Sequence, residues 1–130
     1  RALVKLAPQE LDMHEIVIRD LPLYSQDYDA DFPAIARAFK QAIADSDALL
    51  FVSPEYNRSI PGGLKNAIDW ASRPEGKNAF ARIPAGIIGT SPGSIGTAVA
   101  QSHLRGGVSS CRDRGFPRFR PFRQSDTSLT

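Results

Sequence analysis

Segments in which apolar residues recur every three or four positions alternate along this chain with short, continuous apolar runs. The first kind predicts helices with one buried face, at residues 2–6, 32–44, 61–72 and 97–105. The second kind, rich in Ile, Val, Leu and Phe, predicts strands at residues 13–18, 48–52 and 83–89. A helix separates each predicted strand from the next. This order is typical of an α/β protein with a mostly parallel sheet that helices cover on both faces.

Composition narrows the class of protein. The 130 residues are about one domain long, and a hydrophobic content of 42% is enough for a folded core. No apolar run approaches the ~20 residues that span a membrane, and the N-terminus has no apolar stretch typical of a secretory signal. The single cysteine, Cys111, cannot form an internal disulfide, which favours a reducing compartment. We therefore expect a cytoplasmic protein with no membrane partner.

Positive charge is concentrated near the C-terminal end. The net charge is +2, yet from Arg105 onward six Arg stand against two Asp, which gives +4 there and leaves −2 for the rest. These arginines are spread among Gly, Pro, Ser and Phe, so we expect no nucleic-acid partner. Residues 106–130 have neither a helical nor a strand period. We therefore expect a partial domain over residues 1–105 and a disordered or non-native tail over residues 106–130.

A polar, turn-rich loop follows the strand predicted at residues 48–52. Its sequence is Ser53-Pro54-Glu55-Tyr56-Asn57-Arg58-Ser59-Ile60, and it leads into the helix that Pro61 begins. In an open α/β sheet, ligands bind beside loops that leave the carboxyl ends of strands. This first loop is therefore a candidate ligand site. A second loop of small residues, Thr90-Ser91-Pro92-Gly93, follows the next predicted strand.

The segment from Pro54 to Asp69, with the sequence PEYNRSIPGGLKNAID, resembles the signature of the NADPH-dependent FMN reductases. Asp20-Leu21-Pro22-Leu23-Tyr24 is similar to a substrate-side loop of that family, and residues 90–93 are similar to its second flavin loop. The resemblance covers residues 1 to about 105. It implies a flavodoxin-like, doubly wound parallel sheet, FMN as the cofactor and NADPH as the hydride donor. It also implies a small-molecule electron acceptor, such as a quinone or chromate, and a homodimer or homotetramer.

The physical needs of a flavin ring fit these loops. An isoalloxazine requires a flat slot and hydrogen-bond donors along its edge, and backbone N–H groups at Glu55, Tyr56 and Asn57 are the candidate donors. Small residues in the second loop would let another backbone segment approach the ring. Because the flavin carries the redox chemistry, we name no catalytic side chain and expect no metal. The residues expected to hold the cofactor are Pro54, Glu55, Tyr56, Asn57, Thr90 and Ser91.

The chain departs from the family pattern at both ends. Its first residues match the helix that, in the family, follows a strand and a phosphate-binding loop. We therefore expect that strand and loop to be missing, and the strand at residues 13–18 to lack a neighbour. After Arg105 the sequence stops resembling the family, as a changed reading frame would explain. These departures keep an alternative open, namely a catalytically inactive fragment that self-associates without flavin. A third interpretation is an electron-transfer flavodoxin.

Other conspicuous residues have structural interpretations. Lys65 and Asp69 are four positions apart on a predicted helix, so we expect a weak surface pair. His14 and His103 have no neighbouring metal-ligand residues, so we expect them to be solvated or packed. Trp70 is expected either to pack in the core or to line a slot or subunit interface.

Overall fold

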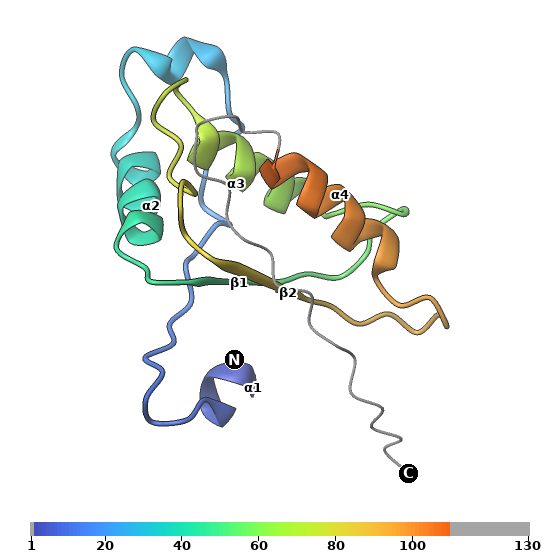
Figure 1. The fold of residues 1–130 in the computed structure, drawn as a ribbon. Helices are drawn as coiled ribbons and strands as arrows, with labels where there is room; N and C mark the ends of the chain where they lie inside the picture. The colour runs from blue at the N-terminus through green and yellow to red at the C-terminus, as the bar shows by residue number, and fades with distance from the viewer. Residues whose placement is uncertain (1, 110–130) are drawn as a thin grey trace.

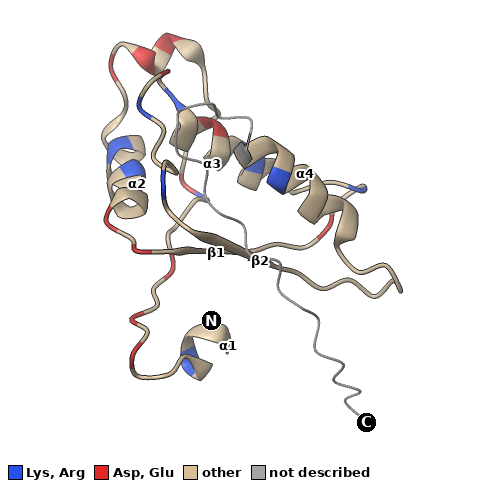
Figure 2. Ribbon diagram, in the orientation of Figure 1, with Lys and Arg blue, Asp and Glu red and all other residues tan. Residues whose placement is uncertain are grey.

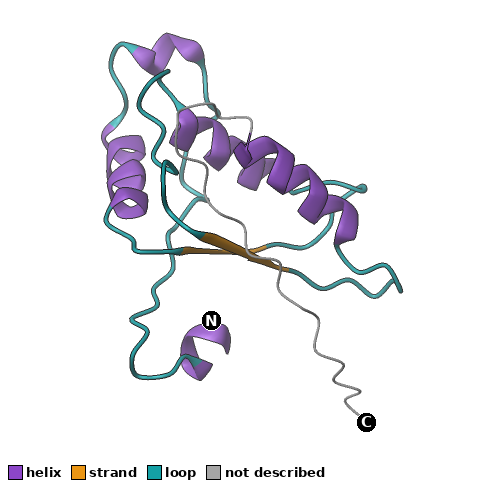
Figure 3. Cartoon of the chain, in the orientation of Figure 1, coloured by secondary structure: helices purple, strands orange, loops and turns teal. Residues whose placement is uncertain are grey.

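The computed structural model of the chain describes residues 2–109, in which helices alternate with two strands (Figure 1, Figure 3). In chain order the elements are α1 (Ala2–Leu6), the short 3-10 helix η1 (Gln26–Asp29), α2 (Ala34–Ala44), β1 (Leu49–Val52), α3 (Gly62–Ser72), β2 (Ala85–Ile88) and α4 (Ala98–Ser109). The predicted α/β class is confirmed, and each predicted helix is present, with one or both ends shifted in all but the first.

The strands β1 and β2 form a parallel pair that α3 connects. Leu49 lies opposite Ala85, and Val52 lies opposite Ile88. A hydrogen bond of 3.1 Å from the Ser53 amide to the Ile88 carbonyl extends the pairing just past β1. Figure 1 shows α2, α3 and α4 on one side of the pair and α1 apart from them. Both strands therefore end at the same edge, where the two loops of the candidate site begin.

The prediction of a strand at residues 13–18 is wrong, because this segment pairs with no other strand within residues 2–109. A strand needs a neighbour that accepts and donates its backbone hydrogen bonds. The only ladder in the described part of the chain joins β1 and β2. Two apolar residues of the segment, Ile16 and Ile18, are partly buried and pack against the margin of the core.

Helix α4 is longer than the sequence predicts. We expected helical structure to stop near Arg105, but the helix continues to Ser109 through Gly106 and Gly107. Leu104 and Val108 are four positions apart and almost fully buried. Their burial on one face stabilises the extra turn despite the two glycines. Residues 110–130, where most of the expected tail falls, lie outside the described residues.

Trp70, on α3, is the centre of the core. Its side chain is fully buried, and its indole Nε1–H donates a hydrogen bond of 2.7 Å to the carbonyl of Pro22. Its ring contacts three other aromatic rings, with centroids 5.1 Å away for Tyr24, 5.4 Å for Tyr28 and 5.1 Å for Phe32. Of the two interpretations of Trp70, core packing is therefore the one observed.

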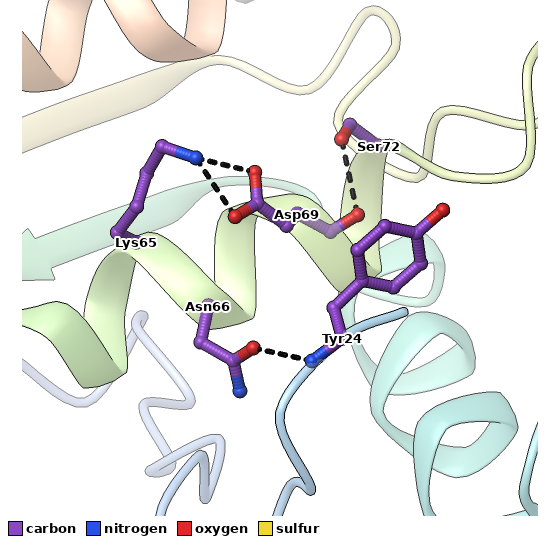
Figure 4. A network of polar contacts seen from close by, with 5 residues as sticks. All are labelled: Tyr24, Lys65, Asn66, Asp69 and Ser72. Atoms are coloured by element: carbon purple, nitrogen blue, oxygen red, sulfur yellow. Dashed lines mark hydrogen bonds and ion pairs between the residues drawn. The ribbon is translucent and has the colours of Figure 1, made fainter. Parts of the chain in front are cut away.

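A network of polar contacts fixes the loop at residues 20–24 against α3 (Figure 4). The side chain of Asn66 accepts a hydrogen bond of 2.8 Å from the Tyr24 amide and donates one of 2.9 Å to the Pro22 carbonyl. On the outer face of the same helix, Lys65 and Asp69 form the expected ion pair at 2.6 Å. The loop that resembles a substrate-side segment is thus held by side chains of one helix.

Lys40, on α2, closes the C-terminal end of α3. Its ammonium donates hydrogen bonds to the carbonyls of Ala71 at 3.0 Å and Lys77 at 2.7 Å, and to that of Arg73. A cation is favourable at this position because the last carbonyls of a helix carry partial negative charge. Burial opposes the charged form and lowers the pKa of Lys40 to about 8.

One face of the strand pair is left uncovered by the described residues. Leu50, Val52 and Ile88 alternate with inward-facing residues and are 43%, 63% and 37% exposed. Neither strand carries a charged residue, so this open face is apolar (Figure 2). The prediction that helices cover both faces of the sheet does not hold within residues 2–109. The same residues include no helix long and apolar enough to cross a membrane.

The contrast between core and open face predicts the effect of two substitutions. Trp70→Phe removes part of a buried ring and the indole N–H that donates to the Pro22 carbonyl. We therefore expect this substitution to lower the free energy of unfolding by about 2–4 kcal/mol. Val52→Thr is the matched control on the open face and should change the free energy of unfolding by about 0.5 kcal/mol or less. Urea unfolding followed by circular dichroism measures both. Equal losses would contradict this description of the core.

Tyr24 gives the stability a dependence on high pH. Burial, and then the 2.7 Å hydrogen bond from its hydroxyl to Asp29, raises the pKa of Tyr24 to about 12 from 10.0. The folded chain therefore holds this proton more tightly than the unfolded chain does. The resulting stabilisation is complete below pH 10 and is lost as the pH rises toward about 12. We expect the stability difference between the wild type and Tyr24→Phe to shrink between about pH 10 and about pH 12. A constant difference in urea midpoints would refute the assignment.

Candidate active site

The two predicted loops meet where the strands end. Residues 53–61 leave β1 and residues 89–97 leave β2, and because the strands are parallel both loops start at one edge of the pair. Figure 1 shows them beyond that edge, with α3 and α4 leading back from it. This is the position at which open α/β sheets bind ligands.

Gly89 lets the two loops approach each other closely. A Cβ atom at this position would lie 2.4 Å from the Ser53 carbonyl oxygen and 2.6 Å from Oγ1 of Thr97. Any other residue would push the loops apart, since real Cβ atoms do not come that near backbone oxygen. The sequence signal was available, because Gly89 ends a predicted strand and a glycine in a strand permits close backbone approach.

The first loop contains a tight turn over residues 56–59. Tyr56 and Ser59 exchange two backbone hydrogen bonds of 2.9 Å, and the residues between them, Asn57 and Arg58, have φ values of 49° and 60°. Positive φ at both central positions is the mark of a mirror-image type I′ turn, in which Asn is common.

This turn corrects one sequence prediction. The Tyr56 amide donates to Ser59, so it is not the flavin donor that we expected. The amides of Glu55 and Asn57 make no hydrogen bond within residues 2–109 and remain candidate donors.

The side chain of Glu55 joins the first loop to α4. Its carboxylate is 9% exposed, and Oε2 accepts a hydrogen bond of 3.0 Å from the amide of Ala100, in the first turn of the helix. Its Oε1 lies 3.5 Å from the guanidinium of Arg58. A carboxylate at a helix N-terminus satisfies an otherwise unpaired amide and is favoured by the helix dipole. Sequence reasoning missed this contact because its partners are 45 residues apart.

A hollow of about 210 Å³ lies between the loops. It is lined by Glu55, Arg58, Ser91, Gly93, Ser94, Ile95 and Gly96. Of the predicted cofactor residues, Glu55 and Ser91 therefore face a common space. Pro54, Tyr56, Asn57 and Thr90 do not line it, and the side chain of Tyr56 is 60% exposed.

A larger hollow of about 660 Å³ lies between α2 and residues 74–79. Four of its five charged side chains already bond to the protein. Arg37 donates to Asp31 at 3.3 Å and to the Phe32 carbonyl, and Lys40 donates to three carbonyls. The loop hollow is the better candidate because it alone of these two lies where both strands end, the position at which open α/β sheets bind ligands.

Comparisons with known proteins identify the family of the chain. The family model of the NADPH-dependent FMN reductases matches residues 1–112. A 2-hydroxy-1,4-benzoquinone reductase from a Burkholderia species is 65% identical over 105 residues, which are 81% of this chain and 57% of that protein. A quinone reductase from Pseudomonas putida is 50% identical over 106 residues, with the same two coverages.

A solved structure of a flavoenzyme has a similar fold. FerB, a flavoenzyme NAD(P)H:(acceptor) oxidoreductase from Paracoccus denitrificans, superposes with a TM-score of 0.84 at 44% identity. The match covers 95% of this chain and 65% of FerB. The chain thus spans little more than half the length of the curated relatives named above. Its fold is flavodoxin-like, and the chain belongs to the NADPH-dependent FMN reductase family.

Proposed function

We propose that the two loops at the ends of β1 and β2 hold one edge of the FMN ring in an NAD(P)H-dependent reductase of quinones. The observation that carries the proposal is the convergence of these loops around a hollow, beside two amides that make no hydrogen bond within residues 2–109. Family membership and the names of the relatives support it.

The residues present suit a ring edge. Pockets that enclose a whole small ligand usually measure about 300–1,000 Å³. The loop hollow, at about 210 Å³, has room for part of such a ligand. Amides at Glu55 and Asn57 supply donors, and the small residues Ser91, Gly93, Ser94 and Gly96 leave space for a flat ring.

Bound FMN would accept a hydride from NAD(P)H and pass the electrons to an acceptor. The chain's own contribution is to orient the ring and to offset the negative charge that reduction places on it. Without partners, the negatively charged Glu55 carboxylate would repel the negative charge of the reduced ring. Its contacts with the Ala100 amide and Arg58 reduce this cost, because both bring positive charge to it.

Further parts of the function follow from the resemblance and are proposed with it. The proposed acceptor is a small quinone, since the two curated relatives described above are named as quinone reductases. Reduction of chromate, assembly into a homodimer or homotetramer, and a cytoplasmic location stay predictions. A second candidate, self-association without flavin, is favoured by the apolar open face of Leu50, Val52 and Ile88.

A flavin-binding experiment separates the two candidates. FMN is added to the purified chain, the excess is removed by gel filtration, and the visible spectrum is recorded before and after NADPH. The proposal expects a retained flavin band that bleaches with NADPH and returns when a benzoquinone is added. A colourless protein that elutes as an oligomer would reject flavin binding and support the second candidate.

Gly89 provides a sharper test of where FMN binds. Gly89→Ala forces the Ser53 and Thr97 segments apart, so we expect the FMN dissociation constant to rise by about tenfold or more. Gly106→Ala on α4 is the control, because nothing lies within 4 Å of a Cβ there, and it should leave the constant unchanged. Flavin fluorescence titration measures the affinity, and circular dichroism checks that both variants fold. If a folded Gly89→Ala variant binds FMN as the wild type does, the ring lies elsewhere.

A further inference from the structure

Helix α4 contacts the first loop at a second point besides Glu55. Nδ1 of His103 lies 3.0 Å from Oγ of Ser59, a hydrogen-bonding distance between residues 44 positions apart. The sequence suggested that His103 is merely solvated or packed. In the structure it bonds the residue that closes the type I′ turn.

The two contacts come from neighbouring positions of the helix, one through a backbone amide and one through a side chain. Ala100 and His103 are three positions apart, so they lie next to each other on α4. Ala100 holds Glu55 before the turn, and His103 holds Ser59 at the end of it. The turn is therefore fixed to α4 on both sides.

The turn needs such contacts because its backbone is strained. Asn57 and Arg58 both have positive φ, a conformation that residues with side chains rarely adopt and that must be supported by surrounding structure. The backbone amide and carbonyl of Ser59 are both bonded to Tyr56, so fixing the Ser59 side chain fixes the whole turn. The direction of the Asn57 amide follows from the turn.

We propose that His103 is a positioning residue for the flavin site, which acts through Ser59 by holding the turn at residues 56–59 against α4. The inference rests on the proposed function, since the turn carries one of the two candidate donors to the flavin. His103 itself needs no contact with the cofactor.

Three variants test the role. His103→Ala removes the bond to Ser59. His103→Asn places an amide close to the position of Nδ1 and can restore it. His14→Ala is the matched control, because it removes the chain's other histidine, which is exposed and lies in the segment before α2.

Two measurements are made on each variant. The first is hydrogen exchange at the Tyr56 and Ser59 amides, which pair within the turn, and the second is the FMN dissociation constant. We expect His103→Ala to accelerate exchange at both amides and to weaken FMN binding, each by about threefold to tenfold. His103→Asn should recover most of both effects, and His14→Ala should show neither.

A Ser59→Ala background sharpens the result. If His103 acts through Ser59, the His103→Ala change should add little once the Ser59 hydroxyl is gone. Additive effects would overturn the proposal, as would unchanged exchange in His103→Ala or failure of Asn to rescue. A wild type that binds no FMN would reject the proposed function and the cofactor part of this inference. The exchange measurements would still decide whether His103 holds the turn.

Discussion

The parallel pairing of β1 with β2 is the constraint on which the candidate site depends. Because Leu49 is in register with Ala85 and Val52 with Ile88, the two strands end side by side. The loops that follow must then begin a few ångströms apart, and only a residue without a side chain fits at Gly89 between them. The buried faces of α2, α3 and α4 support this pairing from one side, around the indole of Trp70.

Those parts of the molecule that depend on neighbours along the chain could be predicted from the sequence. The apolar positions of α2 and α3 recur at helical spacing, so Phe39 and Ile43, or Ala67 and Ala71, had to share a buried face. The ion pair of Lys65 with Asp69 follows from the same spacing. The common edge at which the two loops begin also followed, because the loops after parallel strands open at the carboxyl edge of a sheet.

What the sequence did not reveal depends on contacts between distant residues. The apolar run at residues 13–18 has strand character but pairs with no strand within residues 2–109, and strand pairing cannot be read from a single segment. The links of Glu55 to Ala100 and of Ser59 to His103 join residues 45 and 44 positions apart, and no periodic pattern marks them. The use of the Tyr56 amide within its own turn also required the folded backbone, since the motif alone does not fix φ at Asn57 and Arg58.

The open face of the strand pair has a thermodynamic consequence. Unfolding exposes apolar surface to water, and the newly hydrated area sets the heat-capacity change and the sensitivity to denaturant. Leu50, Val52 and Ile88 are already partly hydrated in the folded chain, so they contribute less to this change than residues between two layers would. The stability curve of residues 2–109 should accordingly be flatter with temperature than that of a sheet enclosed on both sides.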